Sequence, residues 1–391
     1  MKTYVYKRRL LKCIIAIFDA VGYFLKKILF FTQKKYENQI EQILIFKLDH
    51  AGDVLLATPA IKAIRKRFPL AHITLVVGPW SKGIVEGEKY IDEIICYRAY
   101  WRDRNPDRHF NIRDSFQFIR ALRRGKYDMF FDLRGDLFAI IIAALSGIPR
   151  RVGFGWEGGG FLLTDEVETT INKHQAEILL DAARAIGIRP AAAEIAITIS
   201  EDDKKYAYAM LKENNWHESL LTIGLHIGSG CPSKMWAVER YAGLMERIVE
   251  HFKAQIALVG GADDRAVTEQ AEGLLHFKPV NMVGKLTFKQ TAAVMEKCAL
   301  FIGNDSAPVH IAAAVGVPAI VLFSAANDWQ RWRPYGNDVD VICKDVMCKG
   351  CEKAACDDME CMNLITVDEV FDLVSKKIKI VEAEKRLHGI Q

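Results

Sequence analysis

The sequence predicts an α/β fold with two Rossmann-like halves, each built on a parallel sheet. The chain has 391 residues, half of them hydrophobic and 26% charged, which suits two domains that each bury a core. Short apolar strands alternate with helical segments, and this alternation occurs twice along the chain. Polar turns follow several of these strands, at the sheet edge where open α/β proteins bind ligands.

The first half opens with a βαβ pattern. Strands are predicted over residues 42–48 and 72–77, separated by a glycine-containing turn and a helix. Thr58 and Pro59 have the form of a helix start, an N-cap followed by proline at the first helical position. The turn lacks the G-x-G-x-x-G spacing of a dinucleotide fingerprint, but it places Asp53 at the end of the first strand.

The remainder of this half is less regular. Further strands are predicted over 91–96 and 129–133, and helices over 137–145 and 174–186. Residues 101–114 are expected to form a long loop. Residues 150–160, rich in arginine and glycine, are either a flexible segment that admits a ligand or an ordinary surface loop.

The second half repeats the rhythm after a boundary near 190–220. Its predicted strands are 221–227, 255–260, 280–283, 299–303 and 318–323, alternating with helices over 237–252, 263–275, 288–298 and 308–316. We assign 41–200 to an N-terminal domain, 201–220 to a linker helix and 221–342 to a C-terminal domain. A cysteine-rich segment (343–365) precedes a last helix (366–391), which Thr366 and Glu369 open as a capping box.

The stretch GNDSAPVH (303–310) is the clearest local pattern. It joins a buried strand to a short helix, with Asp305 and Ser306 as N-cap residues and Pro308 in the first turn. The N-terminus of a helix offers free N–H groups and partial positive charge, which suit a phosphate. A capped helix without a ligand is the alternative.

Two more polar loops follow strands of this half. GSGCPSK (228–234) combines small residues with Lys234, although the P-loop spacing is absent. Asp263 and Asp264 follow the next strand, where they would hold a ribose hydroxyl or cap a helix. Because carboxyl ends of parallel strands share one edge, the three loops together predict a nucleotide or nucleotide-sugar site.

Residues 1–35 form a basic and apolar tail. They contain nine Lys or Arg and one acid, Asp19, so the rest of the chain carries a net charge of −4 and does not suit nucleic acid. Apolar residues recur at helical spacing, but Lys12, Asp19 and Lys26 interrupt any membrane span. No signal-peptide cleavage site stands out. We predict an amphipathic helix on an anionic membrane surface, with packing on the protein or a partner as the alternative.

Five of the nine cysteines lie within residues 343–361. Four of them are weak candidates for a Zn²⁺ or iron–sulfur site: Cys348, Cys351, Cys356 and Cys361. Their spacing matches no paired Cys-x-x-Cys knuckle, so reduced thiols are the favoured interpretation.

Four stretches resemble glycosyltransferase family 9, the heptosyltransferases of lipopolysaccharide inner-core assembly. They are KLDHAGDVLLATPAIKAIRKRFP (47–69), RRVGF (150–154), HIGSGCPSKMWAVERYAGL (226–244) and GNDSAPVHIAAAVGVPAIVLFS (303–324). The resemblance implies a GT-B fold, with an N-terminal acceptor domain, a C-terminal nucleotide-sugar domain and a cleft between them. It also implies an inverting transfer that requires no metal or cofactor. The typical donor is ADP-L-glycero-β-D-manno-heptose, and the acceptor is a membrane glycolipid core.

The resemblance also assigns roles by position. Asp53 matches the carboxylate taken as general base, and Lys234 matches the lysine on the donor phosphate. The implied donor set is Ser233, Lys234, Asp263, Asp264, Leu286, Asp305, Ser306, Ala307, Pro308 and His310. The predicted acceptor set is His50, Gly52 and Arg134. Ala307 departs from a common glycine, and alanine would be strained there if a positive φ were required.

These observations predict a glycosyltransferase on the cytoplasmic face of the inner membrane. It would move a heptose-like sugar from a nucleotide donor to a lipid-linked saccharide, without a nucleic-acid partner. A GT-B nucleotide-sugar epimerase and a non-catalytic metal-binding assembly protein are the alternatives. Residues 338–340 have the DxD spacing of metal-dependent sugar transferases, but they predict a turn and a strand.

Overall fold

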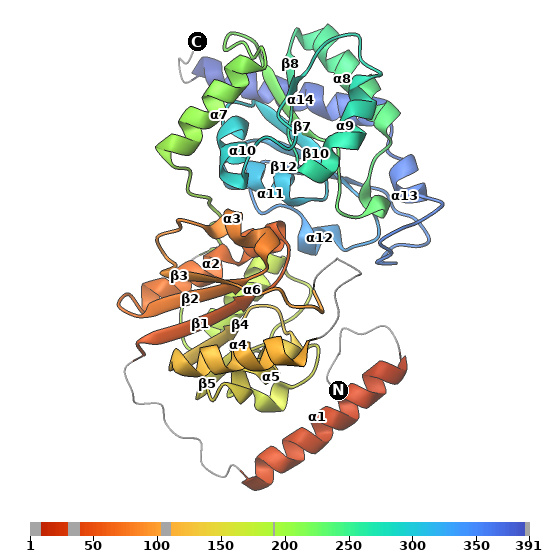
Figure 1. The fold of residues 1–391 in the computed structure, drawn as a ribbon. Coiled ribbons are helices and arrows are strands. Elements are labelled where there is room, and N and C mark those ends of the chain that lie inside the picture. Colours follow the sequence, from red (N-terminus) through yellow and green to blue (C-terminus); the bar gives the residue numbers. More distant parts are fainter. Residues whose placement is uncertain (1–8, 30–39, 103–110, 191, 388–391) are drawn as a thin grey trace. The chain divides into compact units, whose positions relative to one another are not determined.

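The computed structural model describes residues 9–29, 40–102, 111–190 and 192–387. The chain divides into two compact units, Met1–Glu194 and Ile195–Gln391 (Figure 1). In its described part each unit holds one six-stranded sheet, and the strand pairs are parallel. The two predicted Rossmann-like halves are therefore confirmed.

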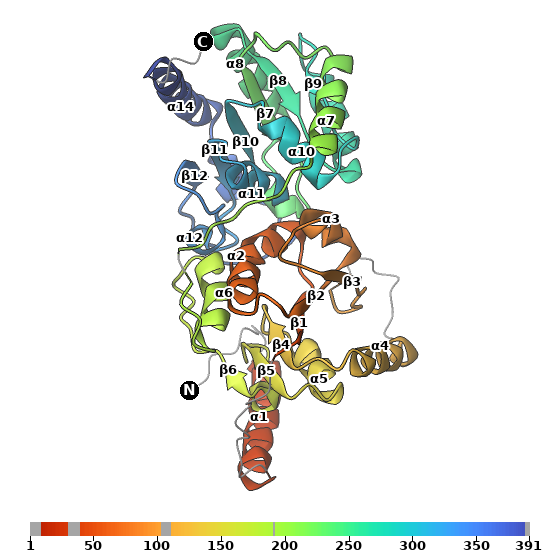
Figure 2. The ribbon, with the colours of Figure 1, turned by 90° about the vertical axis from the view of Figure 1, so that its left-hand side faces the viewer.

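The N-terminal unit is a sheet with helices on both faces. Its strand order is β3-β2-β1-β4-β5-β6. The strands are β1 (Gln42–Lys47), β2 (His72–Val77), β3 (Glu93–Cys96), β4 (Met129–Asp132), β5 (Arg150–Gly153) and β6 (Asp165–Glu166). The helices are α1 (Arg9–Leu29), α2 (Ala51–Arg67), η1 (Pro79–Ser81), α3 (Lys82–Val85), α4 (Ile112–Arg124), α5 (Leu137–Leu145), η2 (Gly160–Leu162) and α6 (Gln175–Arg184). Figure 2 shows α2 and α6 on one face of the sheet and α4 and α5 on the other.

Helix α2 begins earlier than predicted. It starts at Ala51, so Thr58 and Pro59 lie inside the helix and the predicted start at these residues is wrong. Proline leaves the carbonyl four residues earlier, that of Leu55, without its usual donor. The Thr58 hydroxyl supplies one, donating to Leu55 O at 2.8 Å. This local repair allows the helix to continue through the proline.

Two segments expected to be loops contain regular structure. Helix α4 follows an N-cap at Asn111, whose side chain accepts from Arg113 N at 3.0 Å, so the predicted loop over 101–114 is wrong at its end. Residues 103–110 lie outside the described residues. The segment 150–160 is not simply a loop either, because it supplies β5 and the start of η2.

The C-terminal unit repeats the topology of the first, with strand order β12-β11-β10-β7-β8-β9. The strands are β7 (Thr222–His226), β8 (Gln255–Leu258), β9 (Val280–Asn281), β10 (Leu300–Asn304), β11 (Ala319–Phe323) and β12 (Val339–Cys343). The helices are α7 (Glu201–Glu213), η3 (Pro232–Lys234), α8 (Val238–Phe252), η4 (Ala262–Asp264), α9 (Arg265–Glu272), α10 (Phe288–Met295), α11 (Ala307–Ala314), α12 (Trp329–Trp332), α13 (Glu360–Asn363) and α14 (Val367–Leu387). The sixth strand, β12, confirms the turn and strand predicted for residues 338–340.

Each unit has its own hydrophobic core. In the N-terminal unit, Phe46 of β1 and Phe130 of β4 are buried and pack edge to face, with ring centroids 5.2 Å apart. In the C-terminal unit, α8 and α14 cover one face of the sheet and bury Met245 and Phe371. Helices α7 and α10 pack together on the other face (Figure 2). Two such cores fit the hydrophobic content of the chain.

Candidate active site

The central strands of the C-terminal sheet are β7 and β10, and the strand order reverses between them. The loops that follow these two strands lead away to opposite sides, which opens a crevice at the carboxyl edge of such a sheet. The loop after β7 carries Ser233 and Lys234, and the loop after β10 carries Asp305 and Ser306. Four predicted donor residues therefore lie at the expected switch point.

Lys234 and Asp305 form an ion pair across this point. The Lys234 Nζ lies 2.5 Å from Asp305 Oδ2, although the two residues are 71 positions apart. The Asp305 side chain is only 7% exposed, and its burial raises its pKa, while the neighbouring ammonium opposes that rise. The pair brings a cation to the start of helix α11.

His226, at the end of β7, links the loops after β8 and β10. Its Nε2 lies 3.1 Å from Asp264 Oδ2, and its Nδ1 lies 2.9 Å from Ser306 Oγ. Asp264 also accepts Gly261 N–H at 2.8 Å. Burial raises the pKa of Asp264, but these hydrogen bonds outweigh it and the net shift is downward. Asp264 thus has a structural partner, whereas Asp263 is exposed.

Asn304 connects several groups of this site by hydrogen bonds, and the sequence analysis did not predict this role. Its amide Nδ2 donates to the carbonyls of Ile227 and Gly228, both at 3.1 Å. Its Oδ1 accepts from Trp236 N at 3.2 Å and from Tyr241 OH at 3.0 Å. A polar side chain at the end of an apolar strand was the available signal. Asn304 holds the loop after β7 against the end of β10.

The remaining predicted donor residues lie in or near α10 and α11. Ala307 begins α11, and the described residues with positive φ do not include it. The strain foreseen for alanine at this position is therefore absent. Pro308 occupies the first turn and His310 is buried in the same helix. Leu286 is half-buried between β9 and α10.

The cysteine-rich segment is attached to the loop that carries Lys234. Ser233 donates from its backbone N–H to Ala354 O at 3.1 Å and from its hydroxyl to Lys353 O at 2.5 Å. Ser233 therefore has a structural role that its assignment to the donor did not foresee. No group of three or more His, Cys, Asp or Glu in the described residues is placed to hold a metal ion.

The N-terminal unit has a charged cluster at its own switch point, between β1 and β4. The buried Lys47 Nζ lies 2.7 Å from Asp49 Oδ2 and 3.1 Å from Leu133 O, and the Arg134 guanidinium also contacts Asp49. Burial lowers the pKa of Lys47 to about 7, against the opposing charge of Asp53. A lysine within the apolar strand QILIFKL was the signal for this cluster.

Among the predicted base and acceptor residues, Arg134 belongs to this cluster, and His50, Gly52 and Asp53 follow Asp49 in the chain at the start of α2. Asp53 is half-buried in the first turn of α2, and His50 is the exposed N-cap of that helix. On the neighbouring loop, Asp136 accepts from Trp101 Nε1 at 2.8 Å and from Arg102 Nε at 2.9 Å. Asp53 and Lys234 belong to different units, so the two proposed catalytic residues come from separate sheets.

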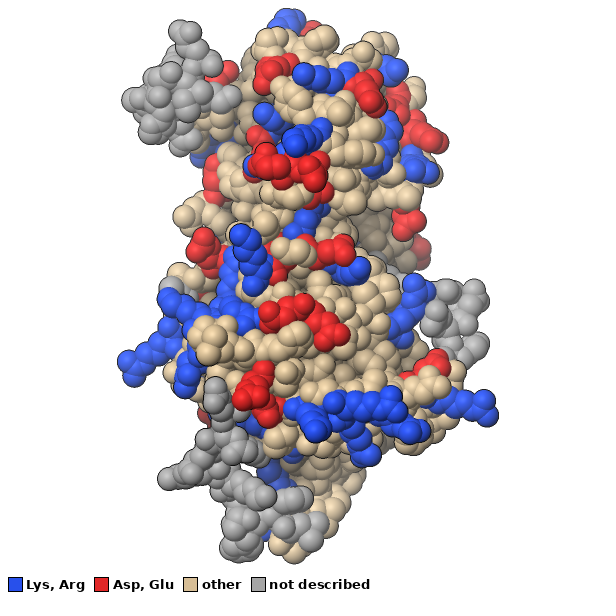
Figure 3. Space-filling view, turned by 60° about the vertical axis from the view of Figure 1, so that its left-hand side comes forward, with Lys and Arg blue, Asp and Glu red and all other residues tan. Residues whose placement is uncertain are grey.

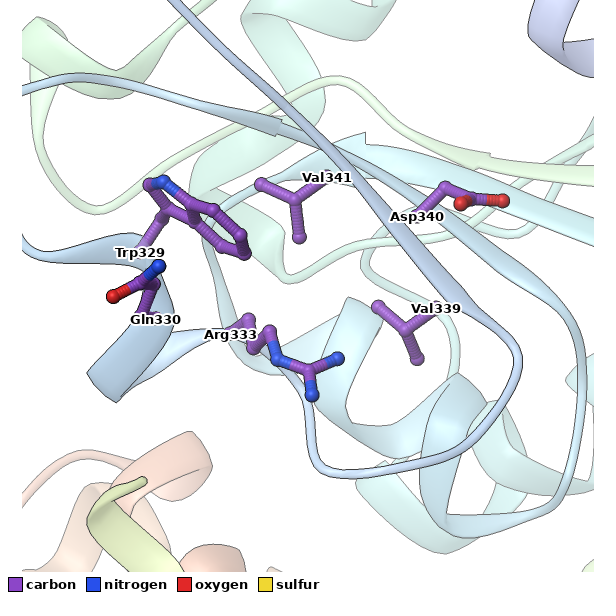
Figure 4. A pocket seen from close by; sticks show the side chains of 6 residues that line it. All are labelled: Trp329, Gln330, Arg333, Val339, Asp340 and Val341. Atoms are coloured by element: carbon purple, nitrogen blue, oxygen red, sulfur yellow. The ribbon is translucent and has the colours of Figure 1, made fainter. Parts of the chain in front are cut away.

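A pocket on the C-terminal unit lies outside the predicted site. It is lined by Trp329, Gln330, Arg333, Val339, Asp340 and Val341, from α12, the residue that follows it and β12 (Figure 4). The Asp340 side chain turns away from the other five and lies 2.8 Å from Lys377 Nζ (Figure 4). None of the predicted donor or acceptor residues lines this pocket.

The model of glycosyltransferase family 9 (heptosyltransferase) matches residues 115–362, more than half of the sequence. The chain belongs to glycosyltransferase family 9. Membership makes it an enzyme and rules against the non-catalytic alternative.

Relatives and solved structures of family 9 agree with this. Lipopolysaccharide core heptosyltransferase OpsX of Haemophilus influenzae is 25% identical over 310 residues, covering 77% of this chain and 84% of the relative. Lipopolysaccharide heptosyltransferase 3 of Escherichia coli is 24% identical over 297 residues, covering 74% of this chain and 84% of the relative.

The family 9 structure from Veillonella parvula DSM 2008 has a TM-score of 0.75 at 23% identity, covering 87% of this chain and 98% of that one. The structure of E. coli ADP-heptose lps heptosyltransferase II has a TM-score of 0.70 at 19% identity, covering 88% and 99%. The structural likeness confirms the GT-B fold class.

Proposed function

We propose that this family 9 enzyme transfers a heptose-like sugar from ADP-heptose to a lipopolysaccharide core or a similar lipid-linked saccharide. The observation that carries the proposal is the Lys234–Asp305 pair at the start of α11, at the switch point between β7 and β10. This arrangement presents a cation and helix N–H groups to a diphosphate. The printed names of the relatives, lipopolysaccharide heptosyltransferases, support the choice of sugar and acceptor.

The proposed reaction is a direct, inverting displacement at the anomeric carbon. Asp53 removes the proton from the acceptor hydroxyl, which then attacks from the side opposite the nucleotide. Lys234 and the N–H groups at the start of α11 offset the charge that develops on the departing ADP. These groups provide the positive charge that a metal ion supplies in other transferases, so the proposal includes neither a metal nor another cofactor.

The proposed location is the cytoplasmic face of the inner membrane, with the enzyme bound peripherally. A lipid-linked acceptor lies at a membrane surface, whereas a nucleotide sugar is dissolved in water, and an enzyme that joins them works at the boundary. In the part of the chain that the structure describes, no helix has the length and apolar character needed to span a bilayer.

Thermal unfolding with ADP, UDP and GDP, without added metal, tests the donor site. A ligand that binds only the folded protein raises the melting temperature. We expect ADP to raise it in the wild type and to have a much smaller effect in Lys234→Met. Lys204→Met, an exposed lysine of α7, is the matched control and should respond like the wild type. Stabilisation by UDP or GDP alone would reject ADP-heptose as the donor.

The Asp53→Asn variant tests the role of the base. Loss of a general base slows transfer by about 10²- to 10⁴-fold. Stabilisation by ADP should persist, because Asp53 lies in the other unit from Lys234. Transfer is measured as ADP release that depends on the acceptor, with Asp114→Asn, an exposed acid of α4, as the control. Near-normal transfer by Asp53→Asn, or loss of its ADP response, would contradict this role.

A further inference from the structure

Helix α1 is attached to the N-terminal unit through one narrow strip. Ile15 and Asp19 are buried in this strip, and Asp19 Oδ1 accepts Gly159 N–H at 2.7 Å. The Tyr23 hydroxyl donates to Glu166, and Lys26 Nζ donates to Leu163 O at 2.6 Å. Figure 1 shows α1 at the lower end of this unit. The helix is thus held in one orientation, by polar contacts as well as by packing.

A different face of α1 is apolar and exposed. Its members follow helical spacing and are 47–65% exposed: Ile14, Ile17, Val21, Phe24, Leu25 and Ile28. Phe18 lies at the edge of this face, where its ring packs edge to face on Phe161 at 5.2 Å. We call these six exposed residues the apolar face of α1. A contiguous exposed face of this kind is typical of an interaction surface.

Outside the strip that attaches α1 to the N-terminal unit, all the charged residues of α1 are positive. Its only acid, Asp19, is 2% exposed and its carboxylate is used by Gly159. Lys12 is half-buried and Lys27 is exposed, and both lie on the same helix as the apolar face. Among the side chains of α1 that the structure describes, the exposed surface is therefore apolar with one exposed cation, Lys27, and it has no accessible carboxylate.

Helix α4 is connected to α1 through two intermediate elements. Contacts run from α1 to η2, from η2 to α5 and from α5 to α4. Four exposed arginines lie on α4 beside one exposed acid, Asp114: Arg113, Arg120, Arg123 and Arg124. Figure 3 shows a row of Lys and Arg over this region. Ile112 and Phe116 of the same helix are 55% and 59% exposed. Helix α4, which is basic and amphipathic, thus belongs to the same connected group of elements as α1.

We propose that α1 and α4 together bind the surface of an anionic lipid bilayer. Helix α1 lies in the plane of the interface, with its apolar face among the upper acyl chains and its lysines among the headgroups. The arginines of α4 add attraction to anionic lipids. This inference rests on the proposed function, whose acceptor is lipid-linked, and it deepens that proposal by naming the surface and the lipid charge.

The charge of the surface selects a bilayer over a second copy of the chain. Joining two copies through this surface would place basic side chains of both copies together, which is unfavourable. Anionic headgroups complement the same charges, and the acyl region accepts apolar side chains. Because α1 is attached by Asp19 and Tyr23, it would position the whole N-terminal unit on the membrane rather than tether it loosely.

The first experiment measures sedimentation of the full chain with vesicles. The vesicles are phosphatidylcholine, with and without phosphatidylglycerol. We expect strong binding to the anionic vesicles, and at least about tenfold weaker binding by the triple variant Ile17→Ser, Phe24→Ser, Ile28→Ser. These side chains are exposed, so the fold should persist, which an unchanged melting temperature and ADP response would verify. Leu70→Ser, which is 90% exposed elsewhere on the unit, is the matched control.

The second experiment tests the charges on α4. Arg120→Gln with Arg124→Gln should weaken binding to anionic vesicles about tenfold, and added salt should weaken wild-type binding. The control, Lys204→Gln with Lys205→Gln on α7, removes two exposed cations from the other unit and should bind like the wild type.

Three results would overturn the proposal. These are no wild-type binding to anionic vesicles, equal binding by the triple variant, or an equal loss in Leu70→Ser. A wild-type dimer that the triple variant makes monomeric, without vesicle binding, would assign the face to a second copy. Vesicle binding requires no donor or acceptor, so its failure is distinct from a failure of sugar transfer.

Discussion

Single residues decide how the proposed donor site is charged. Asp305 is almost fully buried, and an isolated carboxylate in such a place costs several kcal/mol. Lys234 offsets this cost in the folded protein while it places its ammonium beside α11. Stability and proposed donor binding therefore depend on the same contact.

Lys234→Met should make stability more dependent on pH. Without the ammonium, the pKa of Asp305 rises further above its unfolded value, because burial is no longer opposed. The folded state then holds a proton that the unfolded state releases, so stability is lost as pH rises through the folded pKa. We expect the melting temperature of the variant to fall further below the wild type at about pH 7.5 than at about pH 5.

The double variant Lys234→Met, Asp305→Asn is the control, since an amide does not titrate. The amount by which its melting temperature lies below that of the wild type should be nearly the same at both pH values. An equal deficit in melting temperature for Lys234→Met alone at both pH values would contradict the prediction, because it would show that loss of the ammonium leaves Asp305 ionised.

At the scale of elements, one side chain in α2 compensates for a proline inside the helix. Pro59 lies in the helix interior, where it removes one backbone hydrogen bond. The Thr58 hydroxyl restores a donor to Leu55 O. This allows α2 to begin at Ala51, which places Asp53 in its first turn beside the cluster of Lys47 and Asp49.

A double-mutant cycle tests this repair. Thr58→Val removes the hydroxyl donor and should lower the free energy of unfolding by about 1 kcal/mol. In a Pro59→Ala background the new N–H donates to Leu55 O, so the same change should cost clearly less. Urea unfolding of the four proteins measures the coupling. Equal costs in both backgrounds would show that the Thr58 hydroxyl does not compensate for Pro59.

At the scale of the whole molecule, two units of the same strand order carry different parts of the proposed chemistry. The N-terminal unit carries Asp53 and the C-terminal unit carries Lys234 and Asp305. Each unit has its own core, so a change in one core should act mainly on that unit.

Hydrogen exchange of Phe130→Ala tests this division. Phe130 is fully buried, and removal of its ring should cost about 3–5 kcal/mol. We expect faster exchange in β1 and β4, with β7 and β10 unchanged, and we expect ADP to slow exchange in β7 and β10 alone. Met245→Ala, in the other core, should give the opposite pattern. Faster exchange in both sheets of Phe130→Ala would show that the units unfold together.

The sequence alone determined the fold class, the strands of both sheets except β5 and β6, and the polar loops after β7 and β10. These features follow from local patterns. Apolar runs indicate buried strands, and residues such as Asp305 and Ser306 indicate the start of a helix. It failed where a local pattern has two solutions. Thr58-Pro59 can begin a helix or lie within one, and the structure shows the second.

Only the tertiary structure decided which polar groups meet. Lys234 and Asp305 are 71 residues apart, and no sequence pattern indicates that they form a pair. The same holds for His226 with Asp264, for Ser233 with Lys353, and for Asn304 with the loop after β7. The physical reason is that hydrogen bonds and ion pairs act over a few ångströms, so their partners exist only once the strands are ordered in the sheet.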